Sequence, residues 1–208
     1  MRILNCYCGI GGNRRLWTPK GDEHEIVGIE LNPAIAKIYQ DFFPQDKVII
    51  TDAHQYLLEH FKEFDFIWSS PPCPTHSFLA RTNIAQGHFF DYPDMRLYQE
   101  IILLKYIYKK SFCVENVRSY YKPLICPQEV GSHYFWANFF IHPMKIDRCH
   151  PRKKTKGYIK MLQGKKGFDL SEYKKIDKVK LLHNCTEPEL GLHILNESKN
   201  NIQCVLFK

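Results

Sequence analysis

The sequence predicts an α/β fold built on a mostly parallel, doubly wound sheet. Short apolar segments alternate along the chain with longer segments whose apolar residues have helical spacing. The short segments lead into glycines, an acid or a proline-rich turn. This alternation is typical of parallel strands joined by right-handed helical crossovers. Because the carboxyl ends of parallel strands meet at one edge of the sheet, we expect the functional residues to follow the strands.

Length and composition indicate one globular domain. A chain of 208 residues can bury a single substantial core, and 44% hydrophobic with 25% charged residues is typical of globular proteins. No apolar stretch approaches the ~20 residues that a bilayer-spanning helix needs, and the amino terminus begins a strand rather than a signal peptide. We therefore expect a cytoplasmic protein, encoded by a bacterium or phage or located inside a host cell, without a membrane partner.

Cysteine spacing and net charge narrow the function further. Eight cysteines are scattered along the chain without a Cys-x-x-Cys pair, so we expect reduced thiols and neither a disulfide framework nor a zinc site. The formal net charge of +7 favours a polyanionic partner, because lysine and arginine gain affinity by releasing counterions from phosphates.

The first three predicted strands lead into residues that suit a nucleoside-bearing cofactor. Residues 1–7 run into a glycine-rich turn over 8–13, where the backbone can approach a ligand closely, although an ordinary loop explains the glycines equally well. The strand Glu25–Glu30 ends in an acid near the ~20-residue offset of a ribose-binding carboxylate. The strand Lys47–Ile50 precedes Asp52, which suits a helix N-cap, an adenine contact or both.

Helical segments separate these strands. Asn32 and Pro33 suit the N-cap and first turn of a helix that extends to residue 43. A second helix is predicted over 54–61. A third is predicted over 94–110, and its apolar spacing indicates packing on the sheet. We interpret this third helix as scaffold.

Cys73 is the candidate nucleophile. It lies in the proline-stiffened turn 71–74, directly after the fourth apolar segment, 64–68. Prolines fix φ on both sides of the thiol, so its sulfur is expected to point in one direction. A buried structural thiol is the alternative, but the prolines and Glu115, which follows the fifth strand 111–114, favour a nucleophile.

The remaining segments set the expected domain organisation. The long segment 75–93 is predicted to be a lid or binding loop, and 134–141 a further strand. A lysine-rich stretch over 145–180 is either a solvated insertion or a phosphate-contacting surface. A helix over 184–195 carries Pro188 in its first turn. We expect a catalytic core at 1–144, a short basic insertion at 145–180 and a C-terminal helix, within 181–208, that returns to the core.

The order of these motifs resembles the cytosine carbon-5 DNA methyltransferase family. The glycine-rich turn stands where this family has its Phe-x-Gly cofactor loop. It is followed by Glu30, Asp52, the pair Pro72-Cys73 with Ser77 four residues on, and the triplet Glu115-Asn116-Val117. The resemblance covers roughly residues 1–141 and resumes over 184–195. It implies a Rossmann-like class I fold and transfer of a methyl group from S-adenosylmethionine.

The resemblance also implies roles for particular residues. Cytosine carbon 5 is a poor nucleophile, so the Cys73 thiolate would add to carbon 6 while Glu115 stabilises the adduct at ring nitrogen 3. Asn116 would orient the backbone of the site. S-adenosylmethionine would contact Tyr7, Gly9, Gly11, Gly12, Glu30, Leu31, Asp52, Ala53 and Pro71. The substrate would contact Pro72, Ser77, Arg81 and His133. No metal is required.

The expected substrate is double-stranded DNA, from which the target base is flipped into the pocket. Two departures from the family pattern bear on this expectation. Pro74 replaces the glutamine after the cysteine, and 131–133 lacks both arginines of an Arg-x-Arg motif, where His133 could substitute. The short basic segment implies weak sequence specificity or recognition supplied by a partner protein. The same chemistry on RNA or a cytosine nucleotide stays open, as does a weakly active or inactive relative that binds DNA or a partner.

Overall fold

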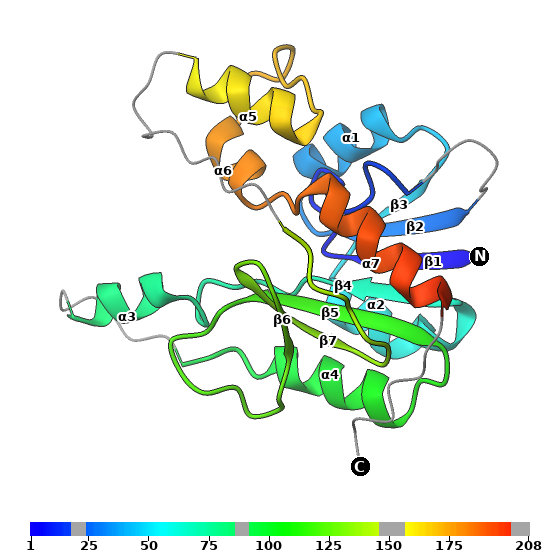
Figure 1. The fold of residues 1–208 in the computed structure, drawn as a ribbon. Coiled ribbons are helices and arrows are strands. Elements are labelled where there is room, and N and C mark those ends of the chain that lie inside the picture. Colours follow the sequence, from blue (N-terminus) through cyan, green and yellow to red (C-terminus); the bar gives the residue numbers. More distant parts are fainter. Residues whose placement is uncertain (18–23, 86–91, 146–156, 201–208) are drawn as a thin grey trace.

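The computed structural model describes residues 1–17, 24–85, 92–145 and 157–200 (Figure 1). These residues form a seven-stranded sheet in the order β3-β2-β1-β4-β5-β7-β6. β1 to β5 pair in parallel, β7 is antiparallel to β5, and β6 is antiparallel to β7. The predicted mostly parallel, doubly wound sheet is confirmed. The strands are β1 Arg2–Cys6, β2 Glu25–Glu30, β3 Lys47–Ile50, β4 Phe66–Ser69, β5 Ser111–Val117, β6 Gln128–Val130 and β7 His133–Ala137.

Helices cover both faces of the sheet. α2 and α4 pack on one face, and α1 and α7 lie on the other (Figure 1). Among the described residues, no helix combines the length and apolarity that a membrane crossing requires. The helices are α1 Pro33–Phe42, α2 Ala53–His60, a 3-10 turn Phe61–Glu63, α3 Phe78–Ala85, α4 Arg96–Tyr106, α5 Tyr158–Lys166, α6 Lys178–His183 and α7 Pro188–Asn200.

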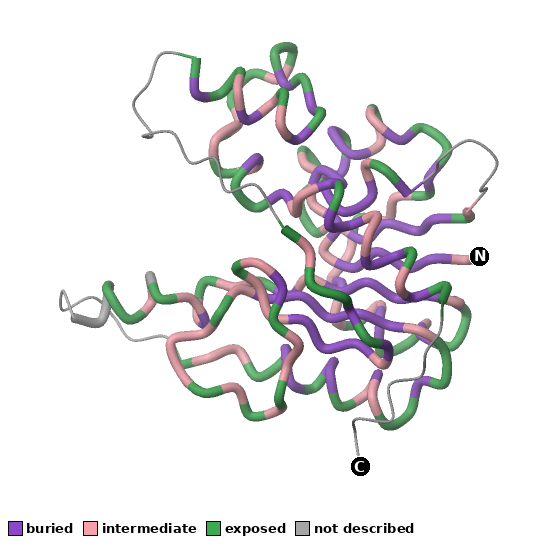
Figure 2. The backbone as a smooth tube through the Cα atoms, viewed as in Figure 1, coloured by how far each residue is buried: buried purple, intermediate pink, exposed green. Residues whose placement is uncertain are grey.

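The central strands are apolar because both of their faces are buried. In β2, Val27 and Ile29 face the α2–α4 side, whereas Ile26 belongs to the cluster beneath α7. The strands β1, β2, β4 and β5 are accordingly buried along most of their length (Figure 2). Such continuous apolar runs are typical of parallel strands covered on both faces.

Strand order reverses between β1 and β4, which are direct neighbours. Cys6 at the end of β1 pairs with Ser69 at the end of β4. In open α/β sheets, ligands bind outside the carboxyl ends of the strands at such a reversal. The glycine-rich turn after β1 and the Cys73 turn after β4 therefore flank the crevice where a ligand is expected.

Several element boundaries differ from those expected. β5 continues through Val117, so Glu115 and Asn116 lie within the strand and pair with Phe135 and Tyr134 of β7. The strand expected at 134–141 ends at Ala137. The local sequence predicts an earlier end to the strand, because the antiparallel partner that extends β5, β7, comes later in the chain.

The structure also differs from expectation in one segment predicted as a loop and in the bounds of two predicted helices. The expected long loop 75–93 contains α3, and its residues 86–91 lie outside the described part of the chain. The helix expected at 94–110 is shortened to Arg96–Tyr106. The helix expected at 184–195 begins at Pro188 and continues to Asn200.

The lysine-rich segment contributes apolar residues to the core. Those of α5, α6 and the intervening residues pack against Ile38, Tyr39 and Phe43 from the α1 region. The segment is therefore a helical unit attached to the sheet, and Lys166 is itself buried. The expected cationic residues Arg148, Arg152, Lys153, Lys154 and Lys156 lie outside the described residues.

We expect Gly191 to be required for the close packing of α7 against the backbone of Asn13. A Cβ atom added there would lie 2.2 Å from the carbonyl oxygen of Asn13, which is backbone and cannot move aside cheaply. Gly191→Ala should therefore lower the free energy of unfolding by about 1–3 kcal/mol, the usual cost of overpacking. The matched control is Gly164→Ala in α5, where a Cβ meets nothing within 4 Å. This variant should gain roughly 1 kcal/mol of helix propensity. Chemical denaturation of both variants tests the pair, and equal stability of the two would contradict the packing.

Candidate active site

The turn that carries Cys73 is held by its own backbone. The Cys73 carbonyl accepts hydrogen bonds from the amides of His76 at 3.0 Å and Ser77 at 3.1 Å. The prolines at 71, 72 and 74 restrict the rest of the turn. The thiol is half-buried. Burial raises the pKa of Cys73, and the negative charge of Glu115 raises it further. The thiol is therefore protonated at neutral pH before any substrate arrives.

Glu115 is a buried carboxyl group with its two oxygens in different surroundings. Oε2 accepts hydrogen bonds from the hydroxyl of Ser70 at 2.9 Å and from that of Thr186 at 3.0 Å. Oε1 lies 3.9 Å from Nε2 of His133, beyond hydrogen-bond distance. Ser70 in turn accepts from the indole nitrogen of Trp68 at 2.7 Å. The protein thus orients the carboxyl group through Oε2.

Asn116 links the strand of Glu115 to the turn of Cys73. Its Nδ2 donates to the carbonyl of Pro71 at 3.0 Å, and its Oδ1 accepts from the amide of Val117 at 2.9 Å. The side chain is buried. These are contacts that a residue orienting the site's backbone requires, since each end of the amide is committed to main chain.

The glycine-rich turn and Glu30 form a second part of the site. Oε2 of Glu30 accepts from the amide of Gly9 at 3.1 Å, and Oε1 accepts from the amide of Asn32 at 2.9 Å. Tyr7 and Gly9 have φ of 55° and 54°, in the left-handed region. A Cβ at Gly9 would meet nothing within 4 Å. The turn therefore presents backbone and a fixed carboxylate toward open space, which suits the hydroxyl groups of a nucleoside.

Two other glycines of this turn serve packing. A Cβ at Gly11 would lie 2.4 Å from the ring of Phe43, and one at Gly12 would lie 2.3 Å from Sγ of Cys185. Both positions are buried. Gly11 and Gly12 therefore act indirectly, because their lack of a side chain lets the turn pack closely against α1 and the segment before α7.

The remaining predicted cofactor residues lie near the same strand ends. Asp52 caps α2, with Oδ1 accepting from the amide of Gln55 at 3.0 Å. Leu31 is 66% exposed directly after β2. Ala53 is buried as the first residue of α2, and Pro71 is buried at the start of the Cys73 turn.

The predicted substrate residues are more dispersed. His133, in β7, faces Glu115 as described above. Pro72 is exposed beside Cys73. Ser77 forms an isolated antiparallel bridge with Ser119, and its hydroxyl donates to the carbonyl of Pro74 at 3.3 Å. Arg81 is exposed on α3, which projects away from the sheet in Figure 1. The structure thus groups His133 and Pro72 with Cys73 and Glu115, and it does not bring Arg81 to them.

Sequence reasoning missed Glu100. This carboxylate of α4 is fully buried and accepts from the hydroxyls of Tyr7 at 2.7 Å and Ser69 at 2.6 Å. It also pairs with Nδ1 of His54 at 2.9 Å, and this hydrogen bond raises the pKa of His54. The available signal was an acid on the apolar face of a helix interpreted as scaffold. Glu100 therefore connects Tyr7, which follows β1, with Ser69, the last residue of β4.

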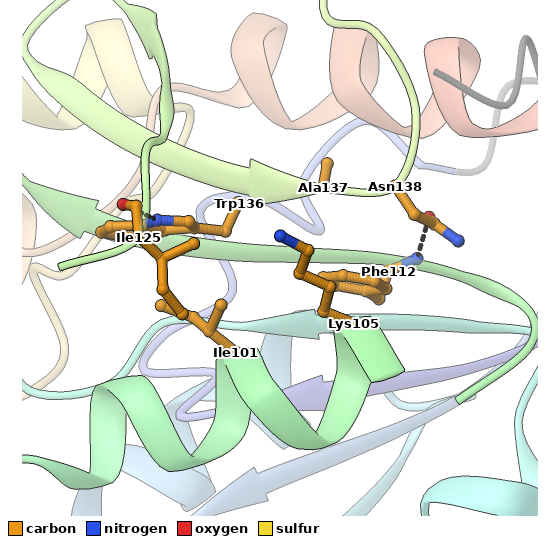
Figure 3. Close-up of a pocket in the computed structure, with 7 residues that line it drawn as sticks. All are labelled: Ile101, Lys105, Phe112, Ile125, Trp136, Ala137 and Asn138. Carbon is orange, nitrogen blue, oxygen red and sulfur yellow. Dashed lines mark hydrogen bonds between the residues drawn. The ribbon is translucent and has the colours of Figure 1, made fainter. Parts of the chain in front are cut away.

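A small pocket lies away from these residues, between α4 and the strands β5 and β7 (Figure 3). Its lining is mainly apolar and contains no predicted site residue. The lining residues are Ile101, Lys105, Phe112, Ile125, Trp136, Ala137 and Asn138. Since it lacks both a nucleophile and an acid, this pocket is not the candidate active site.

The strand order and crossover pattern are those of a Rossmann-like, S-adenosylmethionine-dependent methyltransferase. A family model described as C-5 cytosine-specific DNA methylase matches residues 1–123. The match covers more than half of the 208 residues. The protein belongs to this family.

This chain aligns with only part of the length of each of its individual relatives. The chain is 32% identical to the tRNA (cytosine(38)-C(5))-methyltransferase of Spodoptera frugiperda over 75 residues, which are 35% of this chain and 23% of the relative. It is 27% identical to a mutant of Spodoptera frugiperda DNMT2, covering 56% of this chain and 35% of that one, with a TM-score of 0.41. For the Entamoeba histolytica methyltransferase EhMeth, identity is 18%, coverage 56% and 38%, and TM-score 0.38. The chain thus spans less than two thirds of these relatives.

The charge of Glu115 should be measurable at Cys73. Burial and this charge both raise the pKa of the thiol, so removal of the charge in Glu115→Gln should lower that pKa. The rate of Cys73 alkylation by iodoacetamide, followed by mass spectrometry, should then rise at a lower pH than in the wild type. Glu129→Gln, an exposed acid paired with Arg118, is the control and should leave the profile unchanged. Coincident profiles for Glu115→Gln and wild type would show that the two groups do not interact.

Proposed function

We propose that the protein transfers a methyl group from S-adenosylmethionine to carbon 5 of cytosine in DNA through a covalent adduct on Cys73. The observation that carries this proposal is the presence of a half-buried thiol in the turn after β4 and a buried carboxyl group on the neighbouring strand, β5. A hydrogen bond from Asn116 to the thiol-bearing turn holds the two parts together. Membership of the cytosine-specific family supports the same chemistry.

The reaction begins at Cys73. The thiol proton passes to water, and the resulting thiolate forms a bond to carbon 6 of the ring as the carbon 5–carbon 6 double bond opens. The Glu115 carboxyl group carries a proton on Oε1 and donates it in a hydrogen bond to ring nitrogen 3, where electron density accumulates, while Oε2 stays held by its two hydroxyl donors. Carbon 5 is now nucleophilic and would take the methyl group from the sulfonium sulfur of the cofactor, which would leave as a neutral thioether. A base, for which water suffices, then takes the proton from carbon 5, so that the double bond is restored and the Cys73 thiolate is expelled.

S-adenosylmethionine supplies the electrophilic methyl group when bound. The residues present fit this cofactor, because Glu30 offers carboxylate oxygens for ribose hydroxyls at the end of β2 and Gly9 leaves the backbone open. Asp52 lies at the start of α2 for the adenine amino group, and exposed Leu31 offers an apolar surface for the ring.

DNA is the first substrate because the family model that matches this chain is described as a DNA methylase. The second candidate is tRNA, and the 32% identity to a tRNA cytosine methyltransferase favours it. The net charge of +7 suits either polyanion. We further propose that target recognition rests on the helices α5 and α6 or on a partner protein.

Covalent trapping tests the nucleophile. A DNA oligomer with 5-fluorocytosine should form a stable adduct in the presence of S-adenosylmethionine, because fluorine at carbon 5 cannot be removed as a proton. Cys73→Ala should abolish the adduct, whereas Cys126→Ala, which removes an exposed thiol outside the site, should retain it. Denaturing electrophoresis shows the adduct. The same experiment with tRNA separates the two substrates, and an adduct that persists in Cys73→Ala would refute the nucleophile.

Salt dependence tests the basic helical unit. Lys174 and Lys175 are exposed between α5 and α6. If they contact phosphates, the double alanine variant should reduce the slope of log affinity against log salt by about two, near one per lysine. The control is Lys62→Ala with Lys109→Ala, two exposed lysines at the opposite, amino-terminal edge of the sheet. Fluorescence anisotropy with labelled DNA measures both slopes, and equal slopes would mean that the unit is only solvated.

A further inference from the structure

The segment between α6 and α7 passes over the candidate active site. We call residues 185–187 the strap. Its first residue, Cys185, is buried and packs on Gly12, where a Cβ would lie 2.3 Å from its sulfur and 2.6 Å from the carbonyl oxygen of Thr186. The strap is therefore in direct van der Waals contact with the glycine-rich turn.

Thr186 connects the strap to the catalytic carboxyl group. Its hydroxyl donates to Oε2 of Glu115 at 3.0 Å, and the hydroxyl of Ser70 donates to the same oxygen at 2.9 Å. Both donors act on one oxygen, so together they fix the rotation of the carboxyl group. The loss of a hydrogen bond at a buried oxygen is costly, because no water molecule replaces the missing donor.

The position of the strap is itself fixed by a buried lysine. Nζ of Lys166, at the end of α5, donates to the carbonyl of Cys185 and lies 3.0 Å from Oε1 of Glu187. The lysine is 6% exposed. Burial of an ammonium group is unfavourable unless it is paired, so the pairing ties the end of α5 to the strap. Thr186 lies between the two residues that Lys166 contacts.

We propose that Thr186 is a positioning residue of the active site, which holds Glu115 through Oε2 so that Oε1 is directed to the target base. The inference rests on the proposed function of Glu115. The strap lies outside the residues 1–123 that the family model matches. The C-terminal part of the chain would then complete a site whose reacting groups all come from the amino-terminal part.

The direct test removes only the hydroxyl donor. Thr186→Val keeps the shape of the side chain and should lower kcat for cytosine methylation by roughly 10-fold, the effect of one lost hydrogen bond. The KM for S-adenosylmethionine should stay unchanged, and Thr186→Ser should restore kcat. The control is Ser198→Ala, which removes a buried hydroxyl of α7 bonded to the Leu195 carbonyl and should leave kcat unchanged. Wild-type kcat in Thr186→Val would overturn the proposal, as would failure of Thr186→Ser to restore activity.

A second measurement does not depend on methyl transfer. Thermal unfolding of Thr186→Val, Glu115→Ala and the double variant gives the coupling between the two side chains. We expect Thr186→Val to lower the melting temperature in the wild type and to have a smaller effect when Glu115 is already replaced. If the shifts in melting temperature of the two single variants simply add in the double variant, Thr186 does not hold Glu115, and the proposal is overturned even if the enzyme is active. A wild-type protein that methylates no polynucleotide would instead remove the proposed function, and the unfolding cycle would still decide whether Thr186 holds Glu115.

Discussion

The geometry of the candidate site depends on the hydrogen bond between the Asn116 side chain and the Pro71 carbonyl. A parallel sheet brings the ends of β4 and β5 side by side, with Ser69 paired to Val114. Sheet pairing stops there, while the thiol lies four residues beyond Ser69. Asn116 continues the connection past the last ladder pair, because its Nδ2 reaches the turn directly. The prolines at 71, 72 and 74 restrict the backbone φ angles between this hydrogen bond and Cys73, so the position of the thiol is restricted as well.

The Glu115 carboxyl group near the Cys73 thiol keeps that thiol weakly reactive when no substrate is bound. Burial and the charge of Glu115 keep the pKa of Cys73 raised, so little thiolate is present without a substrate. A base that hydrogen-bonds Oε1 would change the charge distribution around the carboxyl group. With little thiolate present, we expect Cys73 in the unoccupied site to react slowly with alkylating agents and oxidants.

The sequence was sufficient for the features that depend on local pattern. The apolar runs gave β1 to β5, and the capping residues Asn32 and Asp52 lie at the starts of α1 and α2 as expected. Contacts between distant segments were missed. The Thr186–Glu115 bond joins residues 71 positions apart, and the Glu100–Tyr7 bond joins residues 93 positions apart. Neither leaves a periodic signal, because a single polar residue on an apolar helix or in a connecting segment has many alternative partners.

The lysine-rich segment illustrates why composition alone misjudged a region. Charge dominated its interpretation, yet its apolar residues pack on α1, and Lys166 holds the strap rather than facing solvent. Just after the glycine-rich turn in the chain, Arg14 and Asp46 form a buried ion pair, with side chains 5% and 2% exposed. Buried ion pairs contribute little net stability, but breaking one leaves an unpaired charge at a large cost. The Arg14–Asp46 pair therefore fixes the position of the chain after the glycine-rich turn more than it adds stability. A nucleic acid that shifted α5 would act on the strap, and through Thr186 on the carboxyl group that the proposed reaction uses.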